Sequence, residues 1–128
     1  MKLLLDTHAF IWWDSEPQAL SQRVLMLCQD PENELLVSVV SLWEIQIKSH
    51  LGKVRLRLPL AELVQAQQEA NGMSVLPISP SHVYALDELP PYHKDPFDRL
   101  LVAQAKVEKL RLISNDEIEK KYPVEVEW

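Results

Sequence analysis

The residues best suited to chemistry in this sequence are four acids that lie far apart along the chain: Asp6, Glu44, Asp98 and Asp116. Carboxylates that are brought together repel one another and raise one another's pKa unless cations neutralise them. Oxygen-only ligands favour Mg²⁺ or Mn²⁺, and two such ions roughly 4 Å apart can activate water and stabilise the leaving oxygen of an in-line displacement. If the four acids converge, the predicted chemistry is hydrolysis of a phosphodiester.

Alternating strands and helices would bring these acids to one edge of a sheet. Short apolar or β-branched runs predict strands over residues 2–5, 35–40, 74–78, 111–113 and 124–128. Helical spacing predicts helices over residues 8–13, 20–28, 41–51, 60–71, 80–89 and 96–107, with a short one near Asp116. Near-continuous apolar strands indicate parallel neighbours covered on both faces. We therefore predict an α/β fold, a three-layer α/β/α sandwich with a central parallel sheet of about five strands.

Each acid is predicted to lie after a strand or at the start of a helix. Asp6 and Asp116 follow the first and fourth predicted strands. Glu44 lies in the first turn of the helix predicted to open at Ser41, and Asp98 opens the long helix near the end of the chain. In open parallel sheets, ligands bind in the crevice beyond the carboxyl ends of the strands. We therefore expect the four carboxylates to share one rim.

Helix capping is the competing interpretation of these acids. Three pairs have the spacing of a capping box: Ser41 with Glu44, Asp95 with Asp98, and Ser114 with Glu117. Acids in first turns also interact favourably with the helix dipole. Capping accounts for any one acid alone, but it does not account for a convergence of all four.

The composition predicts one cytoplasmic domain over residues 1–128. A hydrophobic content of 47% fills a core without disulfides, and Cys28 is the single cysteine. A run of three leucines before Asp6 is too short for a secretory segment, and no later apolar run reaches the roughly 20 residues of a membrane span. Gly52 and Gly72 are the only glycines, which excludes a P-loop and a GxGxxG motif, so we expect no nucleotide cofactor. The four histidines lack paired ligand spacing, which disfavours zinc.

A net charge of −6 means that a nucleic-acid substrate needs a local basic surface. The candidate residues for contact with RNA are Lys48, Lys53, Arg55, Arg57, Lys94 and Arg99. The alternative for the segment 53–57 is an exposed extended stretch in which basic and apolar residues alternate. Lys94 and Arg99 could instead pair only with neighbouring acids. His93 could carry a proton, but a lone histidine before a helix is more often structural, and we do not include it among the catalytic residues.

Four sequence blocks resemble the VapC-type PIN-domain toxins. They are LLDTH at residues 4–8, SLWEI at 41–45, HKDPFDRLL at 93–101 and SND at 114–116. The resemblance covers nearly the whole chain, and DPFDRLL is its most specific part. It implies a flavodoxin-like α/β/α sandwich, a homodimer, Mg²⁺- or Mn²⁺-dependent cleavage of RNA, and a cognate antitoxin.

The same resemblance assigns roles to individual acids. It makes Asp6, Glu44, Asp98 and Asp116 the first to fourth acids of the family's metal site. Asp95 lies one helical turn from Asp98 and is the expected cap of that helix, although a water-mediated metal contact by Asp95 stays open.

Two other function classes compete with a nuclease. A signalling receiver domain also places acids and Mg²⁺ at strand ends, but it needs adjacent acids after the first strand, where Asp6 stands alone. A catalytically lapsed PIN-like interaction module would keep the acids only as caps. Unchanged ion binding in Asp6→Asn and Asp98→Asn variants would favour that module.

Overall fold

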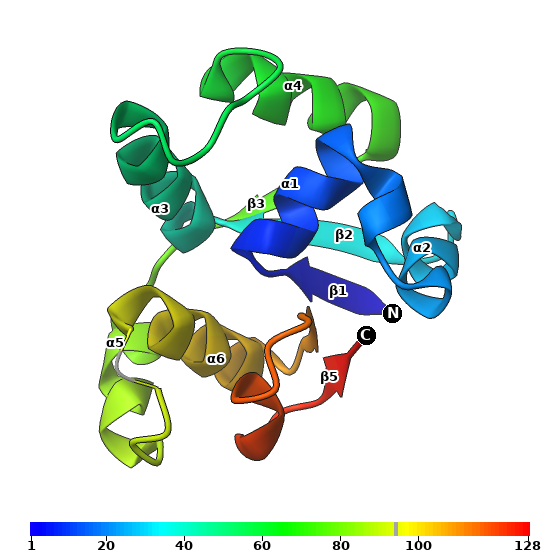
Figure 1. The fold of residues 1–128 in the computed structure, drawn as a ribbon. Helices are drawn as coiled ribbons and strands as arrows, with labels where there is room; N and C mark the ends of the chain where they lie inside the picture. The colour runs from blue at the N-terminus through cyan, green and yellow to red at the C-terminus, as the bar shows by residue number, and fades with distance from the viewer. Residues whose placement is uncertain (94) are drawn as a thin grey trace.

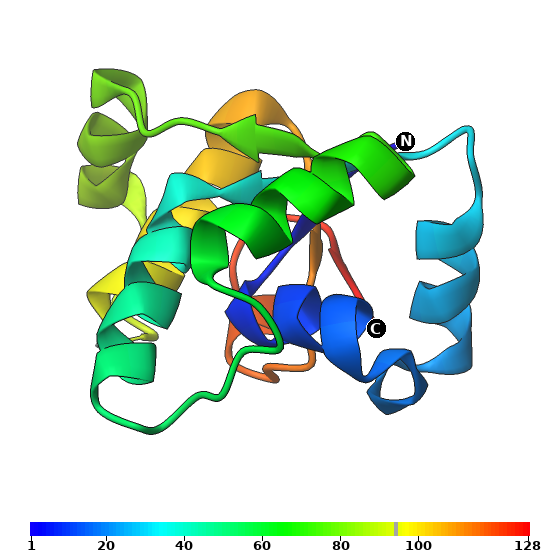
Figure 2. The same cartoon turned by 90° about the horizontal axis from the view of Figure 1, so that it is seen from above.

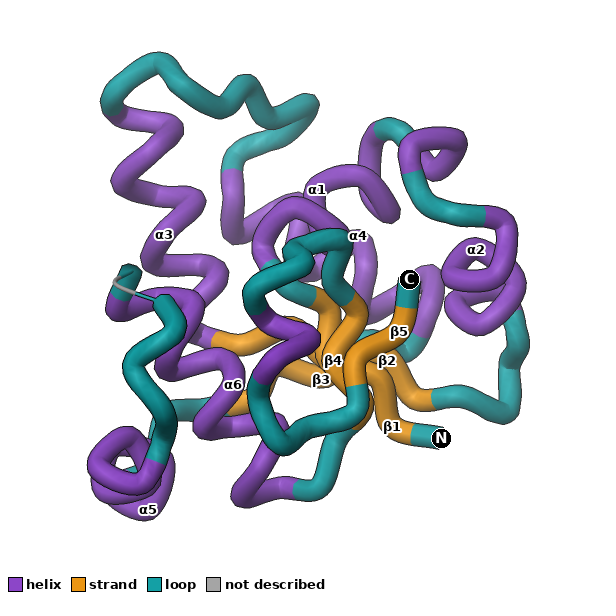
Figure 3. Tube along the Cα trace, turned by 60° about the horizontal axis from the view of Figure 1, so that its bottom comes forward, coloured by secondary structure: helices purple, strands orange, loops and turns teal. Residues whose placement is uncertain are grey.

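The computed structural model describes residues 1–93 and 95–128. Its central element is a parallel sheet, which Figure 3 shows in orange with the helices around it. The strands are β1 (Lys2–Leu5), β2 (Glu34–Ser38), β3 (Ser74–Leu76), β4 (Arg111–Ile113) and β5 (Val126–Glu127). Their order in the sheet is β3-β2-β1-β4-β5, so the first strand of the chain lies in the middle. Leu4 pairs with Leu36 on one side and with Leu112 on the other.

Helices connect the strands. They are α1 (Thr7–Ser15), α2 (Gln22–Gln29), α3 (Val39–His50), α4 (Leu60–Asn71), α5 (Pro80–Ala85) and α6 (Pro96–Glu108) (Figure 1). Short 3₁₀ turns cover Pro17–Ala19, Leu86–Glu88 and Glu119–Lys121. Gly72 ends α4 in a left-handed conformation, with φ of 63°, which a residue without Cβ adopts without strain. None of the helices that the structure describes has the length and apolar character that a membrane crossing needs.

The helices cover both faces of the sheet, so the predicted three-layer α/β/α sandwich is confirmed (Figure 2). Alternate residues of β1 point to opposite faces. Leu3 and Leu5 pack in a core with α1, α2 and α4, whereas Leu4 packs in a second core with α6. All three side chains are fully buried, and each contributes about 1.5–3 kcal/mol of hydrophobic free energy. The buried β1 therefore fixes the position of Asp6, the next residue along the chain.

The boundary between β2 and α3 differs from the prediction. We expected the strand to continue through Val40 and the helix to open at Ser41, but α3 begins at Val39. The Ser38 hydroxyl caps the helix by accepting a hydrogen bond from the Val40 N–H at 3.0 Å. Val40 is fully buried in the second core, and this tertiary packing outweighs the β-preference of valine. Glu44 consequently lies in the second turn of α3, not in the first.

Other elements are shorter than expected. The third and fifth strands end at Leu76 and Glu127, and the helix predicted to reach Leu89 is divided into α5 and a 3₁₀ turn. The helix expected near Asp116 is a 3₁₀ turn that starts at Glu119. Asp116 therefore lies in a loop between β4 and this turn, where its Oδ1 accepts a hydrogen bond from the Ile118 N–H at 2.9 Å.

Candidate metal centre

A cleft of about 380 Å³ lies beyond the carboxyl ends of the strands. Its lining residues are Asp6, Thr7, His8, Trp12, Glu44, Lys48, Asp95, Asp98, Asn115 and Asp116. The structure thus brings together the four acids that the sequence singled out, although they come from β1, α3, α6 and the loop after β4. A larger hollow of about 660 Å³ lies beside residues 52–60, but its lining carries arginines in place of acids.

Asp6 both caps a helix and faces the cleft. Its Oδ1 accepts a hydrogen bond from the Ala9 N–H at 2.8 Å, which begins α1. Burial raises the pKa of this carboxyl, and the Ala9 hydrogen bond only partly opposes that effect. Capping and site formation are therefore not alternatives for Asp6, since one carboxyl group serves both.

Glu44 is buried between a hydroxyl and an ammonium group. Thr7 donates a hydrogen bond to its Oε1 at 2.6 Å, and the Lys48 Nζ lies 2.7 Å from its Oε2. The Ser41 hydroxyl lies 3.1 Å from that of Thr7 and completes the group. The hydrogen bond to Glu44 raises the pKa of the Lys48 ammonium. Lys48 therefore brings a positive charge into an otherwise acidic cleft.

Asp98 lies in the first turn of α6, which Asp95 caps. The Asp95 carboxylate accepts hydrogen bonds from the backbone N–H groups of Phe97 at 2.8 Å and Asp98 at 3.4 Å. Burial, and next the negative charge of Asp95, raise the pKa of Asp98 to about 7. Without a cation, this carboxyl therefore keeps its proton at a higher pH than an ordinary aspartate.

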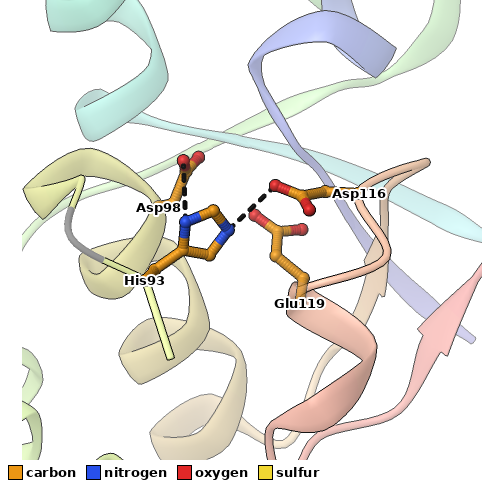
Figure 4. Close-up of side chains that lie close together, drawn as sticks. All are labelled: His93, Asp98, Asp116 and Glu119. Atoms are coloured by element: carbon orange, nitrogen blue, oxygen red, sulfur yellow. Dashed lines mark hydrogen bonds and ion pairs between the residues drawn. The ribbon is translucent and has the colours of Figure 1, made fainter. Parts of the chain in front are cut away.

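Asp116 contacts a histidine that the sequence analysis set aside. The Nε2 of His93 lies 2.8 Å from Oδ2 of Asp116, and its Nδ1 lies 3.7 Å from Oδ2 of Asp98 (Figure 4). His93 therefore sits between two of the four predicted acids. Its position two residues before Asp95, the start of the DPFD block, was the available signal, but a lone histidine gives no ligand spacing from which to infer this contact.

Glu119 is a further acid, buried beside Asp98 and Asp116, that the sequence analysis missed. Its side chain is 0% exposed, and burial raises its pKa to about 9, with the charge of Asp6 contributing next. The Ser114 hydroxyl lies close enough to lower this pKa somewhat. Even so, neither carboxylate oxygen has a hydrogen-bond partner of acceptable geometry among the described residues. Glu119 follows Asp116 by three residues, one turn of a 3₁₀ helix, which was the only sequence signal for it.

The site fits a divalent cation on its own geometry. An unpaired buried carboxyl group at Glu119 and a raised pKa at Asp98 both indicate acids whose ionised form the protein alone does not stabilise. The donors are carboxylate oxygens with one imidazole nearby, a set that Mg²⁺ or Mn²⁺ accepts.

The predicted RNA-binding residues divide into two groups. Lys48 lies in the cleft, and Lys53 and Arg55 are exposed. Arg57 instead forms a two-hydrogen-bond pair with Asp14, at 2.8 and 3.0 Å. Arg99 donates to backbone carbonyls of the segment before α6, namely those of Leu86, Leu89 and Pro90. Lys94 lies outside the described residues.

Arg57 and Arg99 consequently have structural partners that the sequence did not reveal. The carbonyls around Arg99 come from a segment of 3₁₀ turn and loop, where backbone groups lack helical partners. Arg99 therefore contacts these backbone carbonyls and does not show the alternative predicted pairing with Asp95 or Asp98. Both guanidinium groups are thus engaged within the protein.

Comparison with known proteins identifies the family. The family model described as PIN domain matches residues 3–124. Ribonuclease VapC22 of Mycobacterium tuberculosis is 32% identical over 115 residues, which cover 89% of this chain and 86% of that protein. A chain of the VapBC2 structure from Rickettsia felis, bound to a DNA fragment, superposes with a TM-score of 0.74 at 17% identity and covers 100% of this chain and 99% of its own. VapBC-1 from nontypeable Haemophilus influenzae gives a TM-score of 0.68 at 16% identity, with coverage of 99% and 97%. The chain belongs to the PIN-domain family.

Proposed function

We propose that this PIN domain is a metal-dependent endoribonuclease and the toxin of a toxin–antitoxin pair. Asp6, Glu44, Asp98 and Asp116 would hold Mg²⁺ or Mn²⁺ in the cleft, with Asp95 behind them as the cap of α6. The observation that carries the proposal is the convergence of four distant acids in one cleft of about 380 Å³. The name of the M. tuberculosis relative, a ribonuclease, supports RNA as the substrate.

The chain's own residues prepare the site for hydrolysis. A bound divalent cation would supply a Lewis acid that polarises the phosphoryl group and lowers the pKa of water. Thr7 and Lys48 hold the Glu44 carboxylate from both sides, and the hydrogen bonds that Asp95 accepts fix the start of the helix that carries Asp98. In the reaction, water adds to phosphorus, one P–O ester bond breaks, and the leaving oxygen takes a proton.

Lys48 is the residue best placed to contact the substrate phosphate. Its side chain is 32% exposed and lines the same cleft as the acids. An ammonium group there would offset part of the repulsion between RNA and a protein of net charge −6. Lys53 and Arg55, which are exposed beyond the end of α3, would extend this contact along the RNA backbone.

The partners follow from the same family. We propose a cognate antitoxin with a basic segment that complements the acidic cleft, a homodimer, and action in the cytoplasm. A hollow between α3 and α4, lined by Leu42, Leu60 and Val64 with two neighbours, would accept an apolar helix face of the antitoxin.

The test is cleavage of mixed cellular RNA by protein freed of any partner, in Mg²⁺, Mn²⁺ or EDTA. The key variant is Asp98→Asn, and the matched control is Asp87→Asn, which changes an exposed aspartate outside the cleft. We expect discrete cuts that need metal, persist in the control and vanish in Asp98→Asn. No cutting together with no ion binding would overturn the proposal and leave an interaction module with a lapsed site.

A further inference from the structure

Glu119 is a buried acid that the four-acid site does not explain. Its side chain is fully buried, and both carboxylate oxygens lack a hydrogen-bond partner among the described residues. Buried polar groups are nearly always paired, because an unpaired one loses its hydration without compensation. Figure 4 shows its carboxylate beside the imidazole ring of His93 and the carboxylate of Asp116, so the unpaired group points into the cluster and not into the apolar core.

The surrounding donors have the spacing of a single cation position. One ligand atom from each of His93, Asp98, Asp116 and Glu119 can be chosen so that all lie within 4.8 Å of one another. Oxygen ligands lie about 2.0–2.6 Å from a divalent cation, so opposed ligands are roughly 4–5 Å apart. The four side chains therefore need only small adjustments to share one ion.

The fold holds these donors in place before any ion binds. The His93 backbone N–H donates to the Tyr122 hydroxyl at 2.7 Å, and the two rings stack nearly parallel, with an interplanar angle of 3°. Tyr122 is buried and directly follows the 3₁₀ turn that carries Glu119. The histidine and the glutamate are thus fixed to each other through one aromatic side chain, although they come from different segments.

We propose that Glu119 and His93 join Asp98 and Asp116 in one cation position with three carboxylates and one imidazole nitrogen, which binds Mn²⁺ in preference to Mg²⁺. This inference rests on the proposed function, because it adds two ligands to the same metal site. Imidazole is a good ligand for transition-metal ions, whereas Mg²⁺ favours oxygen ligands and water. In the metal-free protein the His93 ring occupies the space between the two aspartates, and the ion would replace its contact with Asp116.

The first test measures Mn²⁺ binding to metal-free protein. The electron paramagnetic resonance signal of the unbound ion reports how much Mn²⁺ remains free. Glu119→Gln removes the charge and keeps the shape, and Glu117→Gln is the control two residues away, whose side chain is 80% exposed. We expect Glu119→Gln to weaken Mn²⁺ binding at least about tenfold and Glu117→Gln to leave it unchanged. Equal Mn²⁺ affinity in the wild type and Glu119→Gln would overturn the proposed ligand.

The second test addresses the imidazole. Competition of Mg²⁺ against bound Mn²⁺ is measured in the wild type and in His93→Gln, which keeps a hydrogen-bonding side chain. We expect the Mn²⁺ preference of the wild type to fall several-fold in His93→Gln, because an amide oxygen replaces the nitrogen donor. An unchanged ratio would show that His93 is not a ligand and would overturn that part of the proposal.

Thermal unfolding in EDTA separates ligand loss from misfolding. Without metal, we expect Glu119→Gln to unfold at the same temperature as the wild type or at a higher one. Added Mn²⁺ should raise the unfolding temperature of Glu119→Gln less than that of the wild type. A lower unfolding temperature with full Mn²⁺ affinity would mean that Glu119 is structural, against the proposal. Glu119-dependent Mn²⁺ binding in a protein that cleaves no RNA would support the cation position and overturn only the proposed function.

Discussion

At the scale of the residue, single side chains in the cleft serve two purposes. Asp6 caps α1 and faces the site, and Glu44 is held by a hydroxyl and an ammonium group at once. Because of these shared roles, substitution of a neighbouring residue changes the position of an acid while the acid itself stays in the cleft. Thr7 is the clearest case, because its hydroxyl donates a hydrogen bond at 2.6 Å to Glu44, a proposed metal ligand.

Thr7→Val tests this positioning role. The change keeps the shape of the side chain and removes the hydroxyl that donates to Glu44, so a buried acceptor loses its partner at a loss of about 1–3 kcal/mol. We expect RNA cleavage to fall by about tenfold and the unfolding temperature by a few degrees. Thr7→Ser keeps the hydroxyl and should retain both. Full cleavage by Thr7→Val would show that Glu44 needs no such support.

The raised carboxyl pKa values predict how the metal-free protein responds to pH. The pKa of Asp98 is about 7 against 3.8 for the ordinary group, and that of Glu119 is about 9 against 4.5. Between about pH 4 and 9 the folded state therefore binds more protons than the unfolded state. Stability is highest below this window and is lost as pH rises through it.

Thermal unfolding in EDTA at several pH values measures this effect. We expect the unfolding temperature to fall by at least about 5 °C from pH 5 to pH 9, and the fall to be shallower in Glu119→Gln. Added Mn²⁺ should oppose the fall, because the ion favours the ionised carboxylates. A rise in stability over the same pH range would contradict the inference that burial disfavours the ionised form of these acids.

At the scale of the element, the layers and the meeting of four acids in one cleft were predictable from the sequence, but the exact helix starts were not. Apolar strands and helical spacing identify the sandwich, and acids after strands identify the rim. Val39 and Val40 have β-branched side chains and look like strand, yet burial of Val40 draws them into α3. Glu119 and Arg99 escaped prediction because their environments are made by segments distant in the sequence.

Ser38 is the residue that fixes the start of α3. Its hydroxyl accepts from the Val40 N–H and donates to the Gln104 side chain of α6, which in turn donates to the Pro77 carbonyl. We expect Ser38→Ala to lower the unfolding temperature by about 5 °C, since it removes a cap worth about 1 kcal/mol and a buried hydrogen bond. Exposed Ser15→Ala is the control. An unchanged unfolding temperature in Ser38→Ala would contradict this account of the helix start.

At the scale of the whole molecule, an exposed apolar stripe on α3 supports the proposed homodimer. Ile47 and Leu51 are 39% and 63% exposed, and they lie four residues apart on one side of the helix. Light scattering should give about twice the chain mass of 14.8 kDa. Ile47→Glu should shift the mass toward the monomer, whereas Gln46→Glu should not. A monomeric wild type at micromolar concentration would contradict the homodimer.

The reaction proposed for this cleft is the hydrolysis of RNA by water with a bound divalent cation. The most direct measurement is mass spectrometry of RNA fragments produced in H₂¹⁸O with Mn²⁺ by the wild type and by Asp98→Asn. We predict terminal phosphates that each carry one solvent oxygen, formed only with metal and not by the variant. Fragments that end in 2′,3′-cyclic phosphate, without solvent oxygen and in the presence of EDTA, would contradict the account.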